Sequence, residues 1–493
     1  MLGRHARSNF VLFLGFAVVA IPLLLWPGQM YDGGRMSLAA EENDLSGFWL
    51  FAGRAGWEAQ FGLLWAENMI SDLLDVGFRS VDLVVALLSV AIVTRETMRL
   101  AERGLGFTRN QATGVGLLVL AFPGWQVLAS SIHTFHAFAT ALGLLGVRRF
   151  VEGTSIWWTI SGTVLWLSGM QLSSNLVLIP VVALIWHNPD LRPSVRLGRS
   201  SWVLLGAVAL FISRRAFFPN EPPYDSYNVF INPFTPFGLR DYPENIAGFL
   251  SVILAPLVLV FLLAAVTRTP VSLRTRRFVS PALLSGASVL PYILVGKSAN
   301  LRGTDEVVDW LFRHAITLAP GLALLTVAAI DQMARSAEDP RRFTRQALVL
   351  SVALLASLSL FGGLSKAGRR AFERDLADAL VPALDDIPAG RLVVQGSDIP
   401  MPKFRGDEAN YWSWSRLNRQ DLWVELGPEA VGLGEPLPTP TSRVEVLDLV
   451  FEGAGDEACE TTLVIESTGY DPASFLGLAP IGRVELLSLD SSC

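Results

Sequence analysis

The sequence predicts an α-helical polytopic membrane protein of about eleven spans, followed by a C-terminal soluble domain of α+β or mostly β structure. Hydrophobic residues make up 51% of the 493 positions and charged residues only 17%, whereas a soluble chain carries about 25% charge. Apolar runs recur as far as Leu364. The remaining residues hold 22 acidic and 11 basic side chains, so a tail of −11 follows a membrane part of +5 in a chain of net charge −6. We therefore expect a membrane domain at 1–364 and a soluble domain at 365–493.

The apolar runs match the length needed to cross a hydrocarbon layer roughly 30 Å thick. A backbone in lipid must satisfy its own hydrogen bonds, so each run is expected to be a helix. The expected spans are 10–25, 79–95, 112–129, 134–147, 155–170, 174–187, 202–218, 246–267, 279–296, 314–331 and 347–364.

Arginines occur in every second loop between these spans, which fixes an expected orientation. Positive loops stay in the cytoplasm, so the N-terminus is expected there and an odd number of spans places the C-terminus outside. We expect a multi-pass protein of a bacterial inner membrane. The loops in question carry Arg95, Arg99, Arg103 and Arg109; Arg148 and Arg149; Arg192, Arg196 and Arg199; Arg268, Arg274, Arg276 and Arg277; and Arg335, Arg341, Arg342 and Arg345.

Three longer segments lie on the expected outer side, at 27–78, 219–245 and 297–313. Long polar loops on one face indicate that the working surface is there. Within the first, residues 57–78 alternate apolar and acidic side chains at helical spacing. This pattern predicts either an interfacial helix lying along the membrane or an ordinary amphipathic connector.

The expected soluble domain begins with an amphipathic helix at 367–382. Short strand-like runs follow, separated by turn residues: RLVVQG, DLWVEL, RVEVLDLVF, TTLVIEST and GRVELLSL. Both cysteines of the chain, Cys459 and Cys493, lie in this part. In an oxidising outer compartment they would form a disulfide, and the alternative is two unpaired thiols.

A cluster of carboxylates in the first outer loop is the strongest candidate for catalysis. Asp32, Glu41, Glu42 and Asp44 lie within 13 positions of one another. Clustered acids raise one another's pKa, which suits general acid–base chemistry. The same oxygens would suit a divalent cation, and a solvated acidic loop is the plain alternative.

Cationic side chains at the outer ends of spans are candidates for holding a lipid phosphate. Arg313 and His314 begin the tenth span, and Arg214 and Arg215 end the seventh. Charge at such depth either reaches back to the interface or serves a function, and arginine fits a phosphate well. His133 and His136 lie three residues apart at the outer side, as polar caps or as part of a metal site.

Several enzyme classes lack their motifs here. The sequence contains no phosphate-binding Gly-Lys-Ser/Thr loop, no H-E-x-x-H and no G-x-S-x-G. The two cysteines are too few for a zinc site of their own. No basic stripe interleaved with aromatics is present, so a nucleic acid partner is not expected.

Taken together, these features resemble the GT-C superfamily of polytopic glycosyltransferases that use polyprenyl-phosphate-linked sugars. RHAITLAPGLALL, with Arg313, His314 and Pro320, is similar to a stretch near the lipid-carrier site in that group. The family's acidic pair would map onto Glu41 and Glu42, or onto Glu42 and Asp44.

The resemblance implies that arginine holds the lipid phosphate and that a loop carboxylate takes a proton from an acceptor hydroxyl. The sugar would then transfer by direct displacement, on the outer face of the membrane. Expected partners are membrane lipids, a lipid-linked sugar donor and a glycan, lipid or protein acceptor.

Two other functions stay open on the sequence alone. A polymerase or ligase of lipid-linked glycans would more naturally place Arg and His in a late outer loop. A transporter or scaffold is the non-enzymatic alternative, although a transporter should show two half-repeats with broken helices, and none is visible.

Overall fold

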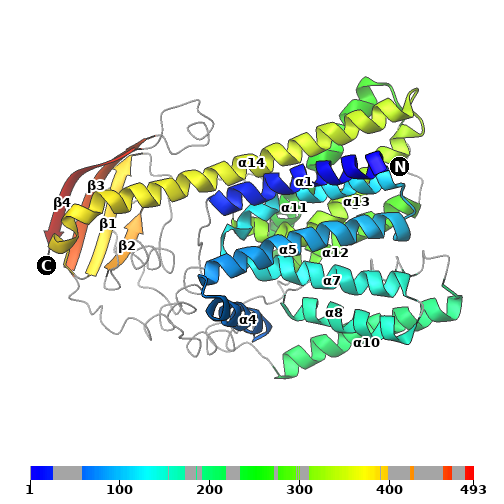
Figure 1. Cartoon of the computed structure of the whole chain (residues 1–493), viewed down its shortest axis with the longest axis horizontal. Helices are drawn as coiled ribbons and strands as arrows, with labels where there is room; N and C mark the ends of the chain where they lie inside the picture. Colours follow the sequence, from blue (N-terminus) through cyan, green and yellow to red (C-terminus); the bar gives the residue numbers. More distant parts are fainter. Residues whose placement is uncertain are drawn as a thin grey trace.

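The computed structural model of the chain describes residues 2–25, 58–153, 155–172, 182, 185, 191–217, 234–270, 276–295, 297, 299, 310–388, 390–397, 422–426, 459–468 and 483–492. Over these residues a bundle of helices is followed by a β-sheet (Figure 1). The sheet lies at one end of the molecule, which we call the sheet end, and α4 lies at the end of the helix bundle nearest to it. The N-terminus and the start of α14 lie at the opposite end.

The helical elements follow the apolar runs of the sequence. They are α1 (Leu2–Leu25), α4 (Glu58–Leu74), α5 (Phe78–Arg99), η1 (Leu100–Gly104), α6 (Arg109–Leu120), η2 (Pro123–Ala129), η3 (Ser131–His133), α7 (Thr134–Glu152), α8 (Ile156–Leu172), α10 (Pro193–Phe217), α11 (Pro236–Val266), α12 (Arg276–Leu294), η4 (Trp310–Leu318), α13 (Ala319–Ala334), α14 (Pro340–Leu380) and η5 (Val381–Asp386).

Three segments of the described chain are long and apolar enough to cross a membrane: Gly238–Val266, Phe312–Ala334 and Pro340–Leu380. The number rises to five if each of two bent helix pairs is one span. The chain is thus a polytopic membrane protein, and the total of about eleven stays a prediction. The expected span 174–187 falls almost wholly outside the described residues.

Two helices differ from their expected forms. The expected span 112–129 is broken, because α6 ends at Leu120 and η2 continues at an angle of 44°. The helix expected at 367–382 is present, but it is the end of the single helix α14 (340–380) and not a separate element. Helix α14 continues through Gly362, Gly363 and Gly368, and no Pro lies between the span and the charged segment.

The interfacial helix expected within 57–78 corresponds to α4. It meets α5 at an angle of 119°, so it turns across the end of the bundle rather than continuing α5 (Figure 1). Helix α4 therefore does not extend the span formed by α5. Its 17 residues pack mainly against α5.

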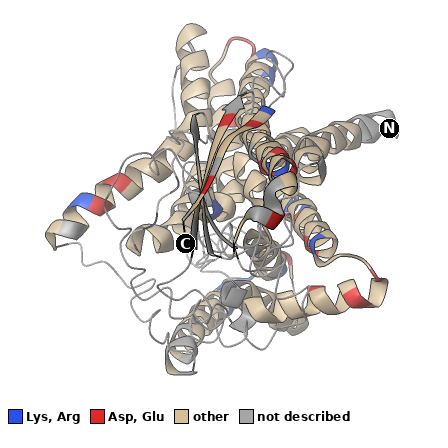
Figure 2. Cartoon of the chain, turned by 90° about the vertical axis from the view of Figure 1, so that its left-hand side faces the viewer, with Lys and Arg blue, Asp and Glu red and all other residues tan. Residues whose placement is uncertain are grey.

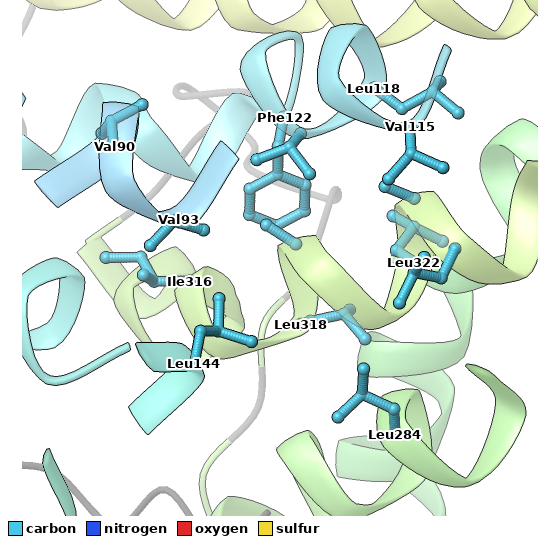
Figure 3. Close-up of a cluster of buried hydrophobic side chains, with 14 of the residues drawn as sticks. Val90, Val93, Val115, Leu118, Phe122, Leu144, Leu284, Ile316, Leu318 and Leu322 are labelled. Carbon is cyan, nitrogen blue, oxygen red and sulfur yellow. The ribbon is translucent and has the colours of Figure 1, made fainter. Parts of the chain in front are cut away.

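The hydrophobic core lies where α5, α6, α7, α12, η4 and α13 meet. Figure 3 shows side chains from these elements facing one another, among them Val93, Phe122, Leu144, Leu284 and Ile316. All five are at most 5% exposed, and they lie in or around the two 3₁₀ segments η2 and η4. The core therefore holds the interruptions in place.

Small residues bring α7 and α8 into close contact. A Cβ atom on Gly169 would lie 2.6 Å from the carbonyl oxygen of Ala139, and one on Gly146 would lie 2.7 Å from that of Gly162. Backbones approach this closely only where side chains are absent, as is common between helices in membranes. The pair α7–α8 thus packs through glycine.

The C-terminal sheet contains β1 (Gly390–Ser397), β2 (Leu422–Leu426), β3 (Cys459–Thr468) and β4 (Arg483–Ser492) in the order β2-β1-β3-β4. The first three strands run parallel and β4 pairs antiparallel with β3. In the view from the sheet end, the strands stand in front of the helices (Figure 2). The expected strand in RVEVLDLVF lies outside the described residues.

Candidate functional site

Two helix interruptions pack against each other and form the frame of the candidate site. Every residue of η2 is buried, and so are Phe312 to Leu318 of η4. The rings of Phe122 and Phe312 lie 6.0 Å apart. Non-α-helical backbone within a membrane protein occurs where it is buried in protein or lines a polar cavity. Both segments meet the first condition.

Polar bonds fix η2 to its neighbours. The indole nitrogen of Trp125 donates to the carbonyl oxygen of Val119 at 2.6 Å, which satisfies one of the carbonyls left over at the end of α6. The side-chain nitrogen of Gln126 donates to Ser359 Oγ of α14 at 3.0 Å. These two hydrogen bonds hold η2 against α6 and α14.

The second interruption, η4, carries Arg313 and His314, which are only 8% and 3% exposed. Arg313 Nε donates to His314 Nε2 at 3.2 Å, and this bond requires an imidazole that is unprotonated at Nε2. The His314 ring faces Tyr292 of α12 with the ring centroids 4.9 Å apart. The guanidinium is thus held in position by its neighbours in the bundle.

Further basic side chains lie in the region of Arg313. His136, in the first turn of α7, is within electrostatic range of both Arg313 and Lys297. Its ring lies 6.3 Å from that of His133 and 4.3 Å from that of Phe135. We call Arg313, His314, His136 and Lys297 the cationic cluster. The positive charges of Arg313 and Lys297, beside imidazoles that can form hydrogen bonds, favour the binding of an anion.

The histidines do not form a metal site within the described part of the chain. No group of three or more His, Cys, Asp or Glu side chains converges there with the geometry to hold a metal ion. The interpretation of His133 and His136 that fits the structure is as members of the buried polar region beside Arg313. Arginine and imidazole in this arrangement suit a phosphate group.

A second polar group lies where α4 meets α5 and escaped the sequence analysis. Arg79 forms an ion pair with Asp82, which is fully buried, and donates through Nη2 to the carbonyl oxygens of Leu128, at 2.9 Å, and Ala129. Arg79 therefore ties the start of α5 to η2. Glu67 of α4 faces Arg79 and is only 3% exposed.

Burial raises the pKa of Glu67 to about 8, and the positive charge of Arg79 opposes this by a smaller amount. In the sequence, Glu67 is one of several acidic residues on α4, together with Glu58 and Asp72. Only the inward direction of its side chain distinguishes it, so composition alone gave no signal.

The other predicted residues are distributed as follows. Asp32, Glu41, Glu42 and Asp44 lie outside the described residues, so their roles stay predictions. Arg214 and Arg215 belong to the last turns of α10, and their side chains lie outside the described part. Cys459 is the first residue of β3, and Cys493 lies just beyond the described end of β4. Only Arg313 and His314 are thus seen to come together.

A separate hollow of about 340 Å³ lies near the start of α14, away from the sheet end, and is lined by Arg342, Arg345, Gln346 and Val349. Its four residues follow one face of a single helix. The hollow contains none of the predicted site residues.

Comparison with solved structures finds whole-chain similarity at low sequence identity. ArnT from Cupriavidus metallidurans matches in the apo state with a TM-score of 0.44 and 17% identity, covering 97% of this chain and 95% of that protein. The structure of ArnT bound to undecaprenyl phosphate matches with a TM-score of 0.41 and 14% identity. The arabinofuranosyltransferase AftD from Mycobacteria matches at 0.41 and 15%, over 92% of this chain and 35% of AftD.

No protein-family model matches the chain, and no curated protein sequence does.

Proposed function

We propose that this chain is a membrane glycosyltransferase that takes a sugar from a polyprenyl-phosphate donor. The observation that carries the proposal is the cationic cluster, in which Arg313 is buried among His314, His136 and Lys297 within a helical membrane protein. A buried guanidinium in a membrane protein marks a functional site more often than a structural one. Arginine binds phosphate through two parallel hydrogen bonds.

The position of the cluster fits a lipid-linked donor. Arg313 lies in η4, the 3₁₀ segment that leads directly into α13, so a phosphate bound there would sit beside a helix start while its lipid chain extended between helices. A lipid-linked donor needs no water-soluble nucleotide, in keeping with a sequence that contains no Gly-Lys-Ser/Thr loop.

The chemistry would follow the route implied by the resemblance. A carboxylate of the first loop, among Asp32, Glu41, Glu42 and Asp44, removes the proton from an acceptor hydroxyl. The acceptor oxygen then attacks the anomeric carbon of the sugar. The bond from that carbon to the phosphate oxygen breaks, and polyprenyl phosphate leaves with the bonding electron pair. Arg313 stabilises the negative charge that develops on the phosphate.

We further propose that the reaction takes place on the outer face of a bacterial inner membrane. The sheet and α4 lie at the end opposite the arginines of η1 and of the start of α14 (Figure 1). The positive-inside rule places those arginines in the cytoplasm, and the sheet end outside.

A binding experiment tests this function. Purified protein in nanodiscs is titrated with undecaprenyl phosphate, the lipid carried by the ArnT complex. Replacing Arg313 by Ala should weaken binding at least tenfold. Arg345→Ala is the matched control, because this arginine is exposed and lies in the separate hollow of α14. Equal binding by wild type and Arg313→Ala would show that Arg313 does not bind the lipid phosphate.

Activity distinguishes transfer from mere binding. Glu41→Gln, Glu42→Gln and Asp44→Asn are made singly and assayed for glycosylated product from a polyprenyl-phosphate sugar. At least one should lose transfer while still binding undecaprenyl phosphate. Full activity in all three would exclude these carboxylates as the base.

A further inference from the structure

Helix α4 buries a mostly polar face and exposes an apolar one. Leu64, Glu67, Asn68 and Ser71 recur at helical spacing and are all less than 7% exposed. The opposite face carries large apolar side chains that are at least half exposed: Trp65 (50%), Met69 (51%), Leu73 (82%) and Leu74 (60%). A helix of a water-soluble protein turns its apolar face inward. Here lipid would cover the apolar face, and the polar face points into the protein.

The surroundings of Glu67 leave one of its oxygens without a hydrogen bond. Within the described part of the chain, Oε1 is buried and has no hydrogen-bond partner. Among the described elements, α4 packs mainly on α5 and also on α8. From α5, Arg79 and Asp82 face this region, and the sequence of α8 contains no ionisable side chain. A buried polar group without a partner is costly, and a ligand that supplies the bond removes that cost.

The chemistry of this face suits hydroxyl groups better than an anion. Arg79 is already engaged by Asp82 and by two carbonyl oxygens, so it is committed to the protein. Burial raises the pKa of Glu67 to about 8, so at neutral pH its carboxyl group both donates and accepts hydrogen bonds. Asn68 adds an amide of the same two-sided character. Such groups pair with the hydroxyls of a sugar.

The inward face of α4 is connected to the cationic cluster through η2, η3 and the start of α7. Arg79 binds the carbonyl oxygens of Leu128 and Ala129, and His133 follows four residues after Ala129. The His133 ring is 6.3 Å from that of His136, which is within electrostatic range of Arg313. The segment 128–136 thus runs from the hydrogen-bond partners of Arg79 to His136, near the proposed phosphate site.

We propose that the inward face of α4 binds the sugar of the lipid-linked donor, with Glu67 bonded to a sugar hydroxyl and Asn68 beside it. This inference rests on the proposed function, since it assigns the second half of the same donor. The phosphate is held at Arg313, and the sugar is recognised under α4. Glu67 then determines preference for the loaded carrier over the bare one.

The test compares two ligands on the whole protein in nanodiscs. Undecaprenyl phosphate is measured against a panel of undecaprenyl-phosphate hexoses and pentoses, and the sugar that wild type prefers is used. Glu67→Ala should lower this preference about tenfold while leaving the affinity for bare undecaprenyl phosphate unchanged. Glu67→Gln, which keeps a donor and an acceptor, should retain most of it. Asp72→Asn, on the exposed face of α4, is the control and should behave as wild type.

The outcomes separate this inference from the proposed function. If wild type binds undecaprenyl phosphate but prefers no sugar-loaded form, or if Glu67→Ala keeps the full preference, the sugar site under α4 is wrong and the phosphate site stands. If wild type binds neither form, the proposed function itself fails. A Glu67→Ala protein that does not fold is replaced in the assay by Glu67→Leu and Asn68→Ala, and unchanged preference in both would likewise overturn the inference.

Discussion

Replacing Glu67 by Gln should abolish a loss of stability that the wild-type protein undergoes as the pH rises. The unfolded chain releases the proton of this carboxyl group near pH 4.5, whereas the folded protein holds it until about pH 8. Between these values the folded state binds the extra proton, so the free energy of unfolding falls with rising pH. Above pH 8 a buried carboxylate remains, and the loss is complete.

The size of the effect follows from the two pKa values. Each pH unit between them corresponds to about 1.4 kcal/mol, so the gap from 4.5 to about 8 sets a ceiling of about 4 to 5 kcal/mol. Water entering beside α4 at high pH would lower it. Glutamine has nearly the same shape as glutamic acid and does not ionise, so the stability of the variant lacks this pH-dependent contribution.

The assay is thermal or denaturant unfolding in a mild detergent at pH 5, 6.5, 8 and 9. The difference in free energy of unfolding between Glu67→Gln and wild type should be near zero at pH 5. As the pH rises, the variant should become steadily more stable than wild type. Taking this difference cancels the titration of all other groups. Asp72→Asn, exposed on the same helix, should show no such trend. A difference that stays constant from pH 5 to pH 9 would refute the buried, protonated state of Glu67.

Three further predictions address packing and cross-links. Gly169→Ala should lower the free energy of unfolding by about 1 to 3 kcal/mol, because its methyl group meets the Ala139 carbonyl oxygen, while Gly143→Ala meets nothing within 4 Å and should be neutral in the same unfolding assay. Asp82→Ala should cost about 3 kcal/mol or more by stranding Arg79, and unchanged stability would contradict the ion pair. Cys459 precedes Glu460 and Cys493 follows Ser492 in the sequence, and β3 pairs Glu460 with Ser492. We therefore expect a Cys459–Cys493 disulfide, so that neither thiol reacts with maleimide before reduction; labelling without reductant would disprove it.

The apolar runs of the sequence predicted the positions of most helices because one physical requirement, burial of the backbone in hydrocarbon, determines them. Arg313 and His314 were found for the same reason, since charge inside an apolar run is conspicuous. The break between α6 and η2 was missed, although Pro123 and Gly124 marked it. Hydropathy averages over such a break and hides it.

Glu67 could not be found from the sequence. Its neighbours on α4 include other acids, and the pattern of acidic and apolar residues is the same whichever face points inward. Direction depends on how α4 turns by 119° against α5, which is a property of tertiary packing. The buried ion pair of Arg79 and Asp82 depends in turn on the carbonyl oxygens that η2 presents, about 50 residues away in the chain.

The central claim, that the cationic cluster holds a lipid phosphate, is tested most directly by an experimental structure of the protein with undecaprenyl phosphate bound. The phosphate should lie in hydrogen-bond contact with the guanidinium of Arg313, beside His314 and at the end of the bundle that carries α4. A phosphate found instead beside Arg342 and Arg345, with Arg313 untouched, would contradict it.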